Sequence, residues 1–262
     1  MILRIVLAGL IALSAPAETR THLLNSPRQR GETVVRVVTP DRLEPGRRYP
    51  VLYLLPVEAE LGARWGDPLA EALRDDLANK FGVIVALPTF SDLPWFADHP
   101  TDPHLRQEAY FLEDVVPLVD REYSTLASAE GRYLAGFSKS GWGAWSLLLR
   151  HPDLFARAAA WDAPLMETTP EKYGMGPIFG TQENFERYQI TRLVRRRAEL
   201  LQGSSRLVLT GYYEGFRRQH VAMHELLEGL AIPHVYRDGP KRAHHWESGW
   251  LGETVELLLR VR

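Results

Sequence analysis

The chain has 262 residues, no cysteine and a formal net charge of −2 at pH 7. Without cysteine, the sequence excludes a disulfide framework, a thiolate nucleophile and a thiolate metal site. Acidic and basic residues are mixed along the chain, so the charge pattern gives no electrostatic footprint for binding nucleic acid.

Residues 1–17 have the features of a secretory signal peptide. A single charge at Arg4 precedes an apolar run from Ile5 to Leu13, and small residues follow up to Ala17. The apolar run is too short to span a bilayer, so we expect cleavage after Ala17 and a secreted or bacterial periplasmic location. An uncleaved lipid-facing anchor is the alternative. No later segment approaches membrane-spanning length, so no membrane span is expected after cleavage.

About 245 residues remain, which suits a single α/β domain over residues 18–262. Apolar runs bounded by glycine or proline alternate along it with segments of helical periodicity. Strands that alternate with helices predict crossover connections and a mostly parallel central sheet flanked by helices. The expected strands are 34–38, 49–55, 82–87, 132–137, 156–161, 206–210 and 234–237, and the expected helices include 69–77, 112–119, 193–201, 216–230 and 254–259. Residues 164–185 carry few periodic signals and are expected to form an excursion over the sheet.

Residues 132–149 predict a short buried strand, a sharp turn at Ser138 and a helix, which is the sequence form of a nucleophile elbow. Small residues must flank such a serine so that strand and helix can approach. Gly136, Ser140 and Gly141 meet this need, although Ser140 stands where the usual Gly-x-Ser-x-Gly pattern has its second glycine. The alternative is a serine N-cap on an ordinary helix.

A serine hydroxyl needs a base to accept its proton and a carboxylate to orient that base. Ser138, Glu214 and His244 follow predicted strands in the order Ser, acid, His of the α/β-hydrolase arrangement. Because ligands bind at the carboxyl ends of parallel strands, these side chains can converge at one edge of the sheet. Asp162 is an alternative acid and His245 an alternative base. Glu214 could instead be an exposed loop carboxylate or a first-turn charge of the next helix.

His244, His245 and Glu247 could suggest a metal site. Neighbouring side chains point apart, however, and no cysteine is present. The sequence therefore predicts no metal at this place and no required cofactor.

Four segments resemble the α/β-hydrolase esterase family that includes esterase D, feruloyl esterases, siderophore esterases and mycolyl transferases. They are residues 48–55, which resemble the strand leading to the oxyanion loop, residues 111–123, the elbow at 136–141, and His244-His-Trp246. The resemblance implies that Ser138 is the nucleophile, Glu214 the acid and His244 the base. Family members usually carry His-Gly after the oxyanion strand, where this chain has Pro56-Val57-Glu58. The expected oxyanion donors are the backbone N–H groups of Lys139 and of Val57 or Glu58.

Aromatic residues near predicted strand ends or helix starts could line an acyl or sugar-binding cleft, with core packing as the alternative for at least half of them. These residues are Trp65, Trp95, Phe96, Trp142 and Trp161.

The sequence thus predicts a secreted serine esterase that hydrolyses a small-molecule or carbohydrate ester. A non-catalytic binding protein of the same fold is one alternative, motivated by Pro56-Val57 in the oxyanion loop. Acyl transfer to a sugar or lipid acceptor, as in the mycolyl transferases, is the other.

Overall fold

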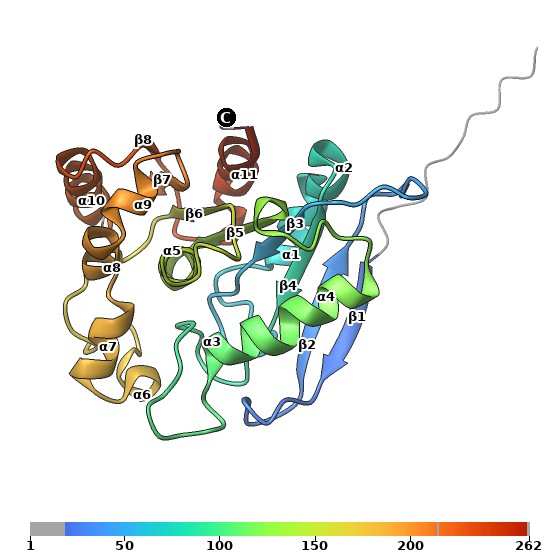
Figure 1. Ribbon diagram of the computed structural model, residues 1–262, viewed down its shortest axis with the longest axis horizontal. Helices are drawn as coiled ribbons and strands as arrows, with labels where there is room; N and C mark the ends of the chain where they lie inside the picture. Colours follow the sequence, from blue (N-terminus) through green and yellow to red (C-terminus); the bar gives the residue numbers. More distant parts are fainter. Residues whose placement is uncertain (1–18, 214, 261–262) are drawn as a thin grey trace, which may run out of the picture.

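The computed structural model describes residues 19–213 and 215–260, and within these ranges eight strands form one sheet (Figure 1). The sheet order is β1-β2-β4-β3-β5-β6-β7-β8. β1 and β2 pair antiparallel, β2 pairs antiparallel with β4, and every pairing from β4 to β8 is parallel. The mostly parallel sheet is therefore confirmed, whereas the expected signal peptide lies outside the described residues. The strands are β1 Thr19–Leu24, β2 Thr33–Val38, β3 Val51–Leu54, β4 Ile84–Pro88, β5 Arg132–Phe137, β6 Arg157–Trp161, β7 Leu207–Tyr212 and β8 His234–Lys241.

Helices cover both faces of the sheet (Figure 1). Apolar residues of α1, α2 and α11 join one buried cluster, while those of the segment from α3 to α4 and of α5, α8 and α10 join the cluster on the other face. The helices are α1 Pro68–Arg74, α2 Leu77–Phe81, α3 Gln107–Tyr110, the π-helical turn η1 Phe111–Val115, α4 Val116–Glu122, the short η2 Ala129–Gly131, α5 Ser138–Arg150, α6 Gly176–Phe179, α7 Gln182–Tyr188, α8 Ile190–Arg196, α9 Ala198–Leu201, α10 Arg217–Gly229, the short η3 Trp246–Ser248 and α11 Trp250–Arg260.

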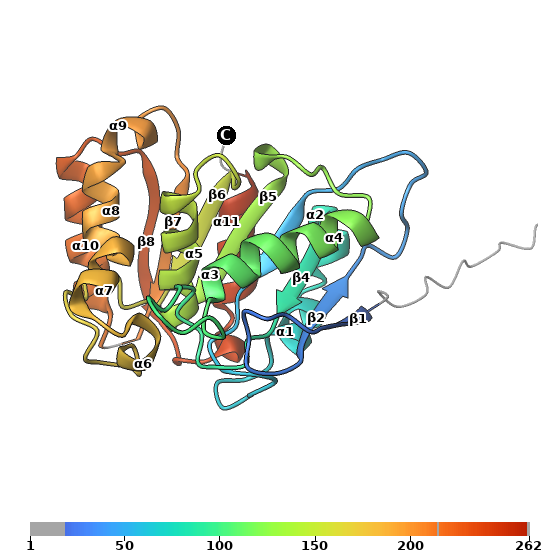
Figure 2. The same cartoon turned by 60° about the horizontal axis from the view of Figure 1, so that its bottom comes forward.

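Two segments differ from the expected secondary structure. The helix expected over 69–77 ends at Arg74, because Asp76 takes a left-handed conformation with φ of 48° before α2 begins. The excursion over 164–185 contains α6 and the start of α7. In both views α6 to α10 gather at the end of the sheet that carries β7 and β8 (Figures 1 and 2).

A buried ion-pair cluster holds α3 against α5 and α7. Glu108 receives hydrogen bonds from Arg150 Nε at 2.6 Å and from the Tyr188 hydroxyl at 2.9 Å, and its Oε1 lies 2.7 Å from His151 Nε2. Burial opposes ionisation of Glu108, but the hydrogen bonds of His151 and Arg150 outweigh it and lower the pKa of Glu108 to about 2. The carboxylate is therefore charged at neutral pH and ties three helices together.

Candidate active site

The chain turns sharply between β5 and α5, and Ser138 lies at that turn. Its φ of 54° is a left-handed conformation that non-glycine residues rarely adopt and that is concentrated at functional sites. A Cβ on Gly136 would lie 2.5 Å from the carbonyl of Ser140, and a Cβ on Gly141 would lie 2.9 Å from the carbonyl oxygen of Gly136. Strand and helix thus approach so closely that only glycine fits at these two positions.

Ser140 is buried in this turn and donates a hydrogen bond from Oγ to the carbonyl oxygen of Phe137 at 2.8 Å. A buried hydroxyl without a partner would be destabilising. The hydrogen bond explains how serine replaces the second glycine of the usual elbow pattern.

Asp162 follows β6 and forms a hydrogen bond through Oδ2 with Nδ1 of His244. Since a carboxylate only accepts, Nδ1 carries the proton and Nε2 is left with a free lone pair. The other oxygen, Oδ1, accepts the backbone N–H of Tyr213 at 2.5 Å. Each oxygen of Asp162 therefore has its own donor, which fixes the carboxylate plane and the tautomer of His244.

The acid beside His244 in the described residues is thus Asp162, the alternative of the sequence analysis. Glu214, the acid preferred there, lies outside the described residues. Asp162 also satisfies the chain order of serine, acid and histidine, and it directly follows β6, the strand that pairs with the elbow strand β5. That adjacency was the signal by which the sequence could have favoured Asp162.

Aromatic rings surround His244 and restrict its orientation. The ring centroids of Trp65 and Phe137 each lie 5.1 Å from that of His244, and Phe216 lies at 5.6 Å. Phe137 directly precedes Ser138, so the elbow itself positions the imidazole.

His220 supports the turn that carries Asp162. It is buried and its Nε2 accepts the backbone N–H of Ala163 at 2.9 Å. Burial lowers the pKa of His220 to about 4, so at neutral pH it is an uncharged acceptor. A cationic imidazole could not accept this hydrogen bond, because both of its nitrogens would be donors.

A cavity of about 800 Å³ opens above these residues, a volume within the range of small-molecule sites. Ser138 and His244 both line it. Its walls also contain the side chains of Lys139 and Arg64, and burial lowers the pKa of Lys139. The remaining lining residues are Trp65, Trp95, Pro164, Tyr173, Tyr213, Gly215, Phe216 and Ala243.

The other residues singled out in the sequence lie in different places. Trp65 lines the cavity, but Trp142 and Trp161 are buried in the two hydrophobic clusters, so they are core residues. His245 turns away toward Gly66 and accepts the backbone N–H of Glu247 at 3.3 Å.

The two expected oxyanion residues, Lys139 and Val57, line different cavities. Lys139 lines the cavity in the first turn of α5, where backbone N–H groups lack an intrahelical acceptor. Val57 is buried and lines a small separate cavity with Pro56 and Trp246.

The serine elbow and the aspartate–histidine pair at the carboxyl ends of a mostly parallel sheet define an α/β hydrolase. Within this class, the sequence matches the family described as putative esterase over residues 82–228, more than half of the chain, and the chain belongs to that family. The family resemblance drawn from the sequence motifs is confirmed.

Known proteins of similar sequence or structure include esterases and a related hydrolase. An esterase of Mycobacterium tuberculosis is 30% identical over 135 residues, which are 50% of this chain but only 29% of that relative. A ferulic acid esterase superposes with a TM-score of 0.74 at 18% identity, covering 94% of this chain and 99% of the other. An S-formylglutathione hydrolase of Staphylococcus aureus superposes with a TM-score of 0.74 at 14% identity, covering 94% and 100%. These structures share the fold.

Proposed function

We propose that this protein is a serine esterase that hydrolyses a carboxylic ester through an acyl-enzyme on Ser138, with His244 as base and Asp162 as the orienting acid. The observation that carries the proposal is the Asp162–His244 hydrogen bond beside a cavity that Ser138 also lines. Family membership supports the same chemistry.

In the first half of the reaction, Ser138 Oγ attacks the ester carbonyl and its proton passes to Nε2 of His244. Asp162 stabilises the resulting imidazolium through Nδ1. The tetrahedral intermediate then expels the alcohol oxygen, which takes the proton from Nε2. In the second half, His244 removes a proton from water, the resulting hydroxide attacks the acyl carbonyl, and Ser138 regains its proton as the acid leaves.

The developing oxyanion needs preorganised N–H donors. The N–H of Lys139 is one, because it directly follows Ser138 in the first turn of α5. The backbone after β3, at Val57 or Glu58, supplies the second. The aromatic residues of the cavity wall suit a small-molecule or carbohydrate ester with a ring in its acyl or alcohol part. They are Trp65, Trp95, Tyr173, Tyr213 and Phe216.

Residues 1–17 direct secretion in this proposal, because they combine a charged start, a short apolar run and small residues before the cleavage position. In the described part of the chain, no helix combines the length and the apolar character that crossing a membrane requires. Sequencing the amino terminus of protein recovered from periplasm or medium tests the cleavage after Ala17. A mature protein that begins at Met1 would contradict it.

The experiment that tests the esterase proposal is labelling of the folded protein with a fluorophosphonate probe, followed by peptide mass spectrometry. The adduct is expected on Ser138 and to be absent from Ser138→Ala and from heat-denatured protein. Ser204→Ala, at an exposed position, is the matched control and should label like the unmodified protein. Turnover of p-nitrophenyl esters of increasing acyl length is measured in parallel. A folded protein that neither labels nor hydrolyses any ester would contradict the proposal.

A further inference from the structure

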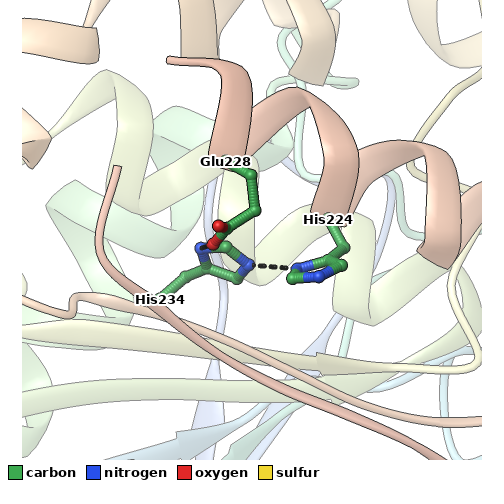
Figure 3. Close-up of side chains that lie close together, drawn as sticks. All are labelled: His224, Glu228 and His234. Atoms are coloured by element: carbon green, nitrogen blue, oxygen red, sulfur yellow. Dashed lines mark hydrogen bonds and ion pairs between the residues drawn. The ribbon is translucent and has the colours of Figure 1, made fainter. Parts of the chain in front are cut away.

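Three metal-ligating side chains lie together far from the serine elbow. His224 and Glu228 stand four residues apart on α10, so they share one face of the helix. The chain turns after Gly229 and enters β8 at His234, which brings that imidazole under the same face (Figure 3). One ligand atom from each of the three residues lies within 4.8 Å of the others.

The hydrogen bonds assign the tautomer of His234. Its Nδ1 lies 2.8 Å from the carbonyl oxygen of Ile232, which can only accept, so Nδ1 carries the proton. Nε2 therefore has a free lone pair, and it faces Nδ1 of His224 at 2.8 Å (Figure 3). An imidazole whose second nitrogen donates to a backbone carbonyl is the usual arrangement of a metal-ligating histidine.

The surroundings hold the two rings but leave the carboxylate free to move. The His234 side chain is 2% exposed, and the His224 ring stacks on Tyr236 with centroids 4.2 Å apart. The Glu228 side chain is 66% exposed and its nearest described partner is His234 Nδ1, at 3.9 Å. The carboxylate lies beside Nδ1 of His234, and a rotation that brings it toward Nε2 completes a set of two nitrogens and one oxygen, whose atoms already lie within 4.8 Å of one another.

We propose that His224, Glu228 and His234 form a binding site for a divalent transition-metal ion of the Zn²⁺ type. Two imidazoles and a carboxylate suit Zn²⁺ in preference to Mg²⁺ or Ca²⁺, which prefer all-oxygen sites. Nitrogens bound to one tetrahedral Zn²⁺ lie about 3.4 Å apart, so the two rings must separate by roughly half an ångström. On binding, the single ring proton of neutral His224 moves from Nδ1 to Nε2, which leaves Nδ1 free to coordinate the ion. Water fills the fourth position.

The place of the site indicates a structural role. His234 begins β8, so the cluster lies at the amino ends of the parallel strands, whereas Ser138 and Asp162 lie at the carboxyl ends. None of the three ligands lines the cavity of the serine elbow. The ion would clamp the last turn of α10 to the edge strand β8, and the other end of α10 follows Phe216 in the cavity wall.

The test is titration of EDTA-treated, dialysed protein with Zn²⁺ by calorimetry, and separately with Mg²⁺ and Ca²⁺. One equivalent of Zn²⁺ is expected to bind, with a rise in Tm of about 5 °C when free Zn²⁺ reaches a hundredfold excess over Kd. Mg²⁺ and Ca²⁺ should leave the Tm unchanged.

Variants assign the binding to these residues. His224→Ala and Glu228→Ala should weaken Zn²⁺ binding by at least about 100-fold and 10-fold respectively, because losing a ligand costs no less than losing a group that supports one. Glu228 is mostly exposed, so its variant folds even if a histidine variant does not. His104→Ala, which removes an exposed histidine outside the cluster, should bind as the unmodified protein does. Zn²⁺ binding that survives in the folded Glu228→Ala and His224→Ala variants, or no binding at all, would overturn the proposal.

Discussion

Replacing Asp162 by asparagine tests which acid serves His244. Asp162 has a φ of 46°, and asparagine is among the residues that tolerate this left-handed conformation best, so the backbone should not change. In the variant the amide oxygen keeps the hydrogen bond with the N–H of Tyr213, because only an oxygen can accept it. The amide NH₂ must then face Nδ1 of His244.

This arrangement forces His244 into the wrong tautomer. Nδ1 must accept from the amide, so the proton moves to Nε2, which can no longer take the proton of Ser138. We expect kcat/KM for a p-nitrophenyl ester to fall about 10⁴-fold, on the scale known for such a change in a serine triad. That factor corresponds to a rise of about 5 kcal/mol in the activation free energy. Tm should change little.

The comparison with Glu214→Gln makes the test decisive. If Asp162 is the acid, Glu214→Gln should retain kcat/KM within about tenfold, because it is then outside the triad. Asp153→Asn, at an exposed turn, is the matched control for the chemical change itself. A loss below tenfold in Asp162→Asn together with a loss above a thousandfold in Glu214→Gln would refute the assignment.

Three further predictions concern the elbow and stability. Gly136→Ala should abolish ester turnover and lower Tm in a thermal melt, because its Cβ would overlap the carbonyl of Ser140; normal activity would contradict the elbow geometry. Glu108→Gln should lower the free energy of unfolding in urea by about 3 kcal/mol, since Arg150 loses its buried charge partner; an unchanged midpoint would show that the pair contributes nothing. Burial lowers the pKa of His220 from 6.5 to about 4, so the unfolded chain binds a proton on His220 more tightly than the folded chain does. The free energy of unfolding is therefore highest above pH 6.5, and it falls between pH 6.5 and pH 4 by at most about 1.4 kcal/mol per pH unit. His220→Gln should flatten that slope in urea titrations, and an equal slope would contradict the assignment.

The buried strands could be predicted because each is an apolar run with clear stops. β3 and β4 are covered on both faces, so their residues need no alternation and stand out in the sequence. β1 was missed for the opposite reason. It is an edge strand whose residues are largely exposed, and Thr-Arg-Thr-His carries no apolar signal.

The aromatic residues show a second limit. Trp65 and Trp142 both lie near predicted strand ends or helix starts, yet Trp65 lines the cavity and Trp142 is fully buried. Trp142 lies one helical turn after Ser138, on the side of α5 that meets Trp95 and Phe179. The sequence places a residue on a helix, but which side faces the core depends on neighbours that are distant in the chain.

The choice of acid was open for a related reason. Asp162 and Glu214 both follow strands of the same sheet, so strand order alone brings either of them to the catalytic edge. What distinguishes Asp162 is the backbone around it. Its N–H donates to the carbonyl of Gly211 at 3.0 Å, its Oδ1 receives Tyr213, and His220 holds the next residue, Ala163. These contacts join β6 to β7 and α10, and none of them is visible as a motif.

The same sheet brings reactive side chains together at both of its ends, but by different means. At the carboxyl ends, residues from separate loops converge because parallel strands all end there, which strand prediction anticipates. At the amino end of β8, His234 meets His224 and Glu228 only because the turn after Gly229 is tight, with the Ile232 N–H bonded back to the carbonyl of Leu227 at 3.0 Å. A spacing of four residues on a helix is readable in the sequence, but the third ligand depends on the geometry of that turn. The serine and histidine of the proposed esterase site could therefore be expected from sequence order, whereas the proposed metal site required the folded chain.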